Sequence, residues 1–96
     1  MKIEILPEAQ ADLDDGYWFY ENQDAGLGEY FLTSIVSDIR SLQLFAGIHS
    51  MFRDKYRLLA NRFPYSVFYS IEDNVVRVYA VTDNRRDPVW ISDRLN

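Results

Sequence analysis

The sequence predicts an α+β fold: an N-terminal strand, an αα-hairpin, and then a three-stranded antiparallel meander, with all strands in one sheet. Residues 65–71 alternate between the two faces of a strand, and residues 75–81 are rich in β-branched and aromatic side chains. Asp73-Asn74 joins these runs, and both residues tolerate the positive φ angles of a tight hairpin. Upstream, two stretches carry apolar residues at three- and four-residue spacing, as amphipathic helices do.

The size and composition of the chain indicate one small domain, residues 1–96. A chain this small buries only about 60–65% of the surface that its unfolded form exposes, so the aromatic content of 16% is important for its core. There are no cysteines, which excludes disulfides and thiolate metal sites. No signal peptide is recognisable and no apolar run exceeds four residues, so we expect a soluble, cytoplasmic protein without a membrane span.

The charge of the chain is unevenly distributed. The formal net charge is −5, which argues against a general nucleic-acid-binding protein. Residues 1–50 contain nine acidic residues and net −7, whereas residues 51–96 net +2. An anionic partner is therefore expected to bind only through the C-terminal half.

The first strand and the first helix follow from residues 2–20. Lys2 to Leu6 alternates polar and apolar residues, which predicts a short strand with one buried face. Pro7 ends this strand and suits the first position of a helix. The apolar face of that helix consists of Ala9, Leu13, Gly16, Tyr17 and Tyr20. Three acidic residues fall mostly off this face, and we expect them to be solvated rather than to bind a metal ion. They are Asp12, Asp14 and Asp15.

A second helix is predicted from about Gly28 to Leu44. Gly26 and Gly28 mark the break between the two helices, which together form an αα-hairpin. The apolar face of the second helix consists of Phe31, Ile35, Ile39 and Leu42. Residues 46–54 have no clear period and are expected to form a loop. We expect the first strand to pair with a non-sequential strand and the hairpin to pack on one face of the sheet.

Several motifs along nearly the whole chain are typical of one family. The C-terminal half contains the Arg62-Phe63-Pro64-Tyr65 turn, the Phe68-Tyr69 strand, and Arg85-Arg86-Asp87-Pro88 followed by Trp90. The N-terminal half contains the Pro7-Glu8-Ala9 helix start, Tyr17 to Glu21, and Gly26-Leu27-Gly28 before a phenylalanine. In this order, these motifs resemble the RelE/ParE family of toxins from bacterial type II toxin–antitoxin systems.

The resemblance implies a compact toxin fold that a cognate antitoxin neutralises by wrapping its C-terminal segment around it. It also implies one of two activities. ParE-like members poison DNA gyrase without a known covalent chemistry, whereas RelE-like members cut messenger RNA in the ribosomal A site. In the RelE-like branch, lysines and arginines act together with a C-terminal tyrosine or histidine.

The side chains favour the ParE-like branch and a non-enzymatic inhibitor. RNA cleavage needs a base, an acid and cations for the developing phosphorane charge. The cations of an endoribonuclease would be Lys55, Arg57, Arg62 and Arg85. After Arg86, however, the tail contains neither Tyr nor His, and Trp90 cannot replace a phenol.

Three other residues could take part in proton transfer. His49 is the only histidine; its place in a loop is typical of a surface residue, although its ordinary pKa would suit catalysis. Tyr56 and Tyr65 fit the strand alternation, so we expect them to be core or half-buried residues.

A group of C-terminal residues is the predicted target- or antitoxin-binding surface. Its members are Arg57, Arg62, Arg85, Arg86 and Trp90. Arg57 is expected on a solvent face, where its guanidinium suits a carboxylate of an acidic antitoxin tail as well as a phosphate. Ion pairs with Asp83 and Asp87 are the alternative for the paired arginines. No cofactor or metal is expected. Besides the gyrase inhibitor and the ribosome-dependent ribonuclease, a non-toxic antitoxin-binding module remains as a third hypothesis.

Overall fold

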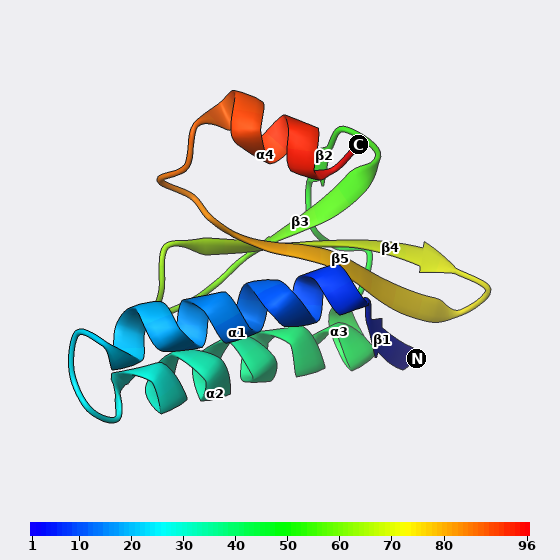
Figure 1. Cartoon of the computed structure of the whole chain (residues 1–96). Helices are drawn as coiled ribbons and strands as arrows, with labels where there is room; N and C mark the ends of the chain where they lie inside the picture. The colour runs from blue at the N-terminus through cyan, green and yellow to red at the C-terminus, as the bar shows by residue number, and fades with distance from the viewer.

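The computed structural model describes residues 1–96 and contains one five-stranded mixed sheet between two helical layers (Figure 1). The strands lie in the order β1 (Lys2–Ile5), β5 (Val75–Asp83), β4 (Tyr65–Glu72), β3 (Lys55–Leu59) and β2 (Met51–Phe52). β1 is parallel to β5, and every other neighbouring pair is antiparallel. The helices are α1 (Pro7–Glu21), α2 (Leu27–Arg40), α3 (Leu42–Phe45) and α4 (Pro88–Arg94).

The main core lies between the sheet and the hairpin of α1 and α2. Leu13, Phe31 and Ile35 from the helices are at most 1% exposed and belong to one cluster with the β4 residues Val67 and Tyr69. A smaller cluster on the opposite face of the sheet joins Phe68 and Ala80 to Ile91 of α4. The hairpin and α4 therefore cover opposite faces of the sheet (Figure 1).

The αα-hairpin turns sharply because a carboxylate and two glycines act together. Gly26 adopts a φ of 89°, which a residue with a side chain rarely tolerates. A Cβ at Gly28 would lie 2.5 Å from the Tyr17 carbonyl oxygen, so only glycine allows this close approach of α1 and α2. The Glu21 carboxylate accepts hydrogen bonds from the backbone N–H groups of both glycines and so satisfies the start of α2.

The predicted α+β class is confirmed, as are the pairing of the first strand with a non-sequential strand and the packing of the hairpin on one face. β3, β4 and β5 are consecutive antiparallel neighbours, but the sheet is larger than predicted because β2 extends it within the expected loop 46–54. β2 has only two residues, too few to show a period. The second helix was predicted to reach Leu44, but α2 ends at Arg40 and a separate short α3 follows.

The helix α4 was not predicted. Asp87 accepts a hydrogen bond from the Val89 N–H at 2.7 Å, and Pro88 follows at the first helical position. This is an ordinary helix start, but the helix has only seven residues, too few for the apolar spacing to be distinctive. None of the helices combines the length and the apolar character that crossing a bilayer requires.

The prediction that Asp12 is a solvated helix residue is wrong. β1 pairs with β5 only as far as Val78, so the outer edge of β5 beyond that point has no strand beside it. There the half-buried Asp12 carboxylate accepts the Val81 N–H at 2.9 Å and pairs with Arg94 of α4 at 2.6 Å. Burial raises the pKa of Asp12, although the hydrogen bonds from Val81 and Arg94 act to lower it. Asp12 thus connects α1, β5 and α4.

Replacing Gly16 by alanine should destabilise the protein. A Cβ at Gly16 would lie 2.5 Å from two atoms of the Phe31 ring, which is itself fully buried. Overpacking a core costs about 1–3 kcal/mol, more than the about 0.5–1 kcal/mol that alanine gains over glycine in a helix. Urea unfolding of Gly16→Ala should therefore show a lower free energy of unfolding than the wild type.

A double-mutant cycle with Phe31→Leu tests the cause. In the Phe31→Leu background, Gly16→Ala should cost less, because the smaller side chain leaves room for the methyl group. A stabilising effect of Gly16→Ala in the wild-type background would contradict this account of the contact between α1 and α2.

Candidate functional site

Two neighbouring loops bring three arginines to one end of the sheet. The loop 60–64 joins β3 to β4, and the loop 84–87 joins β5 to α4. The Asn84 N–H donates to the Pro64 carbonyl at 2.7 Å, so the two loops lie side by side. We call Arg62, Arg85 and Arg86, which are exposed on these loops, the arginine surface.

Arg62 is held on a fixed loop but has no partner of its own. Asp38 of α2, which is 9% exposed, accepts hydrogen bonds from the backbone and side-chain N–H groups of Asn61 at 3.1 and 2.8 Å. This fixes the residue just before Arg62. Arg62 itself is exposed and takes part in none of the ion pairs or side-chain hydrogen bonds. Its guanidinium is therefore free to meet a carboxylate or a phosphate of a partner.

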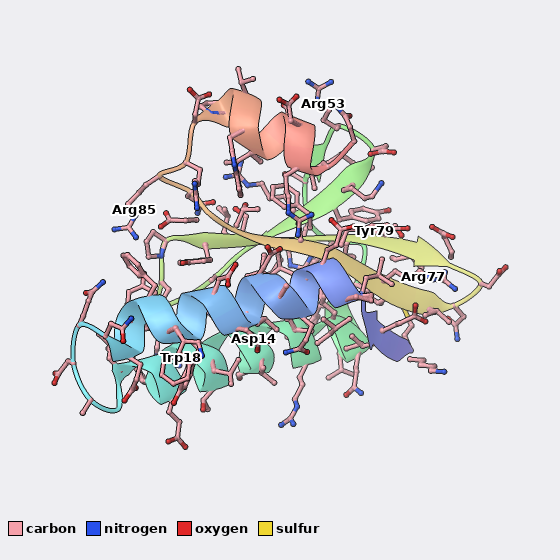
Figure 2. All side chains as sticks on the ribbon, viewed as in Figure 1. Asp14, Trp18, Arg53, Arg77, Tyr79 and Arg85 are labelled. Carbon is pink, nitrogen blue, oxygen red and sulfur yellow. The ribbon has the colours of Figure 1, made fainter.

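Arg85 and Arg86 each contact one side chain of the same protein. Arg85 donates from two nitrogens to the two carboxylate oxygens of Asp83, at 2.9 and 2.6 Å. This contact lowers the pKa of Asp83 and raises that of Arg85. The Arg86 guanidinium lies over the Trp90 ring, 4.3 Å from its centroid. Figure 2 shows the Arg85 side chain projecting from the loop that precedes α4.

Arg57 borders the loop 84–87 of the arginine surface but is not exposed on it. The prediction that it occupies a solvent face is wrong, because the residue is half-buried. Its Nε donates to Ser66 Oγ at 2.8 Å and an Nη donates to Asn84 Oδ1 at 3.1 Å, while the guanidinium lies near the rings of Phe52 and Phe68. Arg57 thus supports the loop 84–87 through its hydrogen bond to Asn84 and does not face the solvent.

The four cations named for a ribonuclease do not gather at one place. The Lys55 side chain is 12% exposed, pairs with Asp54 at 3.1 Å and lies over the Tyr79 ring at 4.6 Å. Lys55 and Arg57 are two residues apart on β3 and therefore lie on the same face of the sheet, the face that α4 covers. Arg62 and Arg85 lie instead on the loops at the end of the sheet.

The three candidate proton-transfer residues are buried or contact buried side chains. Tyr65 is 7% exposed, and burial is the main reason that its pKa rises to about 12. Tyr56 is stacked on Tyr69, as expected of a half-buried strand residue. His49 Nδ1 bonds to the Tyr69 hydroxyl, and burial lowers the pKa of His49. None of the three is placed as an exposed acid or base beside Arg62.

A cleft of about 470 Å³ opens beside the arginine surface, between α1, β5 and α4. We call it the α1–α4 cleft. Its walls are lined by Asp12, Asp15, Gly16, Phe19, Tyr65, Val81, Thr82, Asp83, Arg86 and Trp90. Of these, only Arg86 and Trp90 were predicted from the sequence to be binding residues. The spacing of Asp12 and Gly16, four residues apart on one helix, could have placed Asp12 beside the sheet.

Both the sequence and the fold are similar to those of known toxin–antitoxin proteins. The family model described as the ParE toxin of the type II toxin–antitoxin system parDE matches residues 3–88. A solved structure described as the chromosomal ParDE toxin–antitoxin system from P. aeruginosa is similar with a TM-score of 0.74. The match has 22% sequence identity and covers 86% of this chain and 95% of that one. At this identity the structural match concerns the fold. The comparison with curated proteins found no match.

The burial of His49 predicts a pH-dependent stability. The Tyr69 hydroxyl accepts the Gly47 N–H and also bonds to His49 Nδ1, which holds the imidazole in a partly buried position. Because burial lowers the folded-state pKa below 6.5, the unfolded chain binds the proton more tightly. Stability should be complete above pH 6.5 and fall as the pH drops from there towards the folded pKa.

Urea unfolding of the wild type and His49→Gln at pH 7.5 and 5.5 would measure this effect. The loss of stability between the two pH values should be larger in the wild type, since glutamine does not titrate. An equal pH dependence in both proteins would show that His49 is not responsible.

Proposed function

Because the chain belongs to the ParE toxin family of type II toxin–antitoxin systems, we propose that it is a toxin that inhibits DNA gyrase and is neutralised by a cognate antitoxin. The observation that carries this proposal is the arrangement of the cations. Arg62, Arg85 and Arg86 are exposed on two adjacent loops, whereas Lys55 and Arg57, the other two cations of a potential ribonuclease site, are engaged within the fold. Both proposed partners act in the cytoplasm, so we place the toxin there.

The arrangement supports a binding protein over a nuclease. Cleavage of RNA requires a base near the 2′-hydroxyl and an acid near the leaving oxygen. Tyr65, with a pKa of about 12, is a poor base at neutral pH, and its ring lies in the core. His49 is bonded to the buried Tyr69. The arginine surface therefore lacks the proton-transfer groups that would make it catalytic.

Electrostatics favour a protein target. The net charge of −5 opposes binding to the dense phosphate of the ribosome, whereas a few exposed guanidiniums suit carboxylates on a protein surface. Arg62, which has no internal partner, would make the strongest such contact. Arg86 of the neighbouring loop 84–87, which lies over the Trp90 ring, can add contact area.

Reversing the charge of Arg62 should weaken gyrase inhibition. Purified wild-type toxin should block supercoiling by gyrase, and Arg62→Glu should require at least about tenfold more protein, which corresponds to about 1.4 kcal/mol. Arg40→Glu is the matched control, because Arg40 is also exposed but lies at the end of α2. It should inhibit like the wild type. An equal loss in both variants would indicate a general charge effect.

The other two hypotheses give different results in the same preparation. A ribosome-dependent ribonuclease would produce codon-phased cuts in translated messages, visible by primer extension, and would leave supercoiling unchanged. A non-toxic module would leave both assays unchanged and still bind the antitoxin. Unchanged supercoiling at high toxin excess would contradict the gyrase proposal.

A further inference from the structure

The α1–α4 cleft lies where the sheet has an unpaired edge. β1 stops pairing with β5 at Val78, and α1 and α4 stand on either side of the remaining edge. Asp12 satisfies the Val81 N–H there and fixes α4 through Arg94. The cleft is therefore part of a fixed framework, and its volume of about 470 Å³ is in the range of ligand pockets, about 300–1,000 Å³.

The charge of the cleft suits a cation. Three carboxylates line it, from Asp12, Asp15 and Asp83, against the single guanidinium of Arg86. Asp12 is engaged with Arg94, and Asp83 is engaged with Arg85. Asp15 is exposed and takes part in no ion pair, so its carboxylate is available to a partner.

A second feature indicates a hydrogen-bonding ligand. Thr82 is 2% exposed and lines the cleft, and its hydroxyl is the one buried side-chain polar atom without a hydrogen-bond partner. Buried polar groups in native proteins almost always have a partner, because burying one without a hydrogen bond is costly. A ligand that donates hydrogen bonds could satisfy the Thr82 hydroxyl and the Asp15 carboxylate.

The aromatic residues of the cleft suit a planar cation. Phe19 and Trp90 are 50% and 39% exposed, and Tyr65 lies in the wall between α1 and α4. The Trp90 ring already accepts the guanidinium of Arg86 at 4.3 Å. A guanidinium is planar, stacks on aromatic faces and presents several donors in a fixed fork, whereas an ammonium presents a compact charge.

We propose that the α1–α4 cleft holds an arginine side chain from the antitoxin segment that neutralises the toxin. This inference rests on the proposed function for the identity of the partner. The guanidinium stacks against the aromatic wall and donates to Asp15 and to the Thr82 hydroxyl. An anionic side chain would be repelled by the unpaired Asp15 carboxylate, and a purely apolar one would leave Asp15 and Thr82 without partners.

The first experiment tests the cleft without any partner protein. N-acetyl-arginine amide is titrated into the full-length toxin and followed by the amide and indole resonances in NMR spectra. It should shift the resonances of Asp15, Thr82 and Trp90 in a saturable manner at millimolar concentrations. The citrulline analogue has the same shape without the charge and should need at least about tenfold higher concentration, which would correspond to 1.4 kcal/mol. Equal shifts with both compounds, or no shifts in the cleft, would overturn the proposal.

Two variants test the residues that carry the inference. Asp15→Asn should weaken binding of the arginine amide several-fold, whereas Asp14→Asn, on the same helix but not in the lining of the cleft, should not. Thr82→Val removes the hydroxyl and keeps the shape. It should leave unfolding by urea unchanged or raise its midpoint, and should still weaken binding. Normal binding by both Asp15→Asn and Thr82→Val would overturn the assignment of these contacts.

The last experiment separates this inference from the proposed function. Affinity for the cognate antitoxin is measured for the wild type, Asp15→Asn and Asp14→Asn, and gyrase inhibition by the wild type is measured in parallel. Asp15→Asn should bind the antitoxin at least about fivefold more weakly than Asp14→Asn. Equal antitoxin affinities would overturn the role of the cleft in neutralisation, even if gyrase is inhibited. A toxin that leaves gyrase unaffected but shows the difference in antitoxin affinity would overturn the gyrase proposal alone.

Discussion

The carboxylate of Asp12 connects three parts of the molecule that are remote in sequence. It belongs to α1, accepts the Val81 N–H at the unpaired edge of β5 and pairs with Arg94 of α4. α4 otherwise packs on the sheet mainly through a small cluster around Ile91. Because Asp12 is half-buried, breaking the pair would leave a carboxylate with too few partners, which is costly in a small domain. The position of α4 therefore depends on where β1 stops pairing with β5.

The position of α4 in turn decides which cations reach the surface. α4 covers the face of the sheet on which Arg57 lies, and Arg57 becomes a support for Asn84. Arg62 and Arg85 lie on loops outside this cover and stay exposed. Because α4 covers the face of the sheet that carries Lys55 and Arg57, the arginines proposed to bind a partner are those on the two loops. The same covering helix supplies Trp90 to the α1–α4 cleft.

The parts of the fold that depend on local patterns could be predicted from the sequence, and the parts that depend on register could not. The helix faces around Leu13 and Phe31 follow from three- and four-residue spacing, which local sequence contains. The helical spacing of Asp12 and Gly16 could place Asp12 beside the sheet, but its bond to the Val81 N–H depends on where the β1–β5 pairing ends, which no local pattern encodes. The sequence grouped Arg57 with Arg62, Arg85 and Arg86 as a binding surface, but it did not give their different exposures. Arg57 is half-buried only because Ser66 and Asn84 come beside it from two other segments.

The two candidate binding surfaces share Arg86 and meet at Asp83. Asp83 lines the α1–α4 cleft and also holds Arg85 of the arginine surface. A segment that meets both surfaces must therefore carry a cation for the cleft and an anion for Arg62 or Arg85, in that spatial order. A segment with the order reversed would place like charges together at both positions, which is costly in a partly buried contact. Specificity for one antitoxin can thus arise from repulsion of the wrong partners as much as from attraction of the right one.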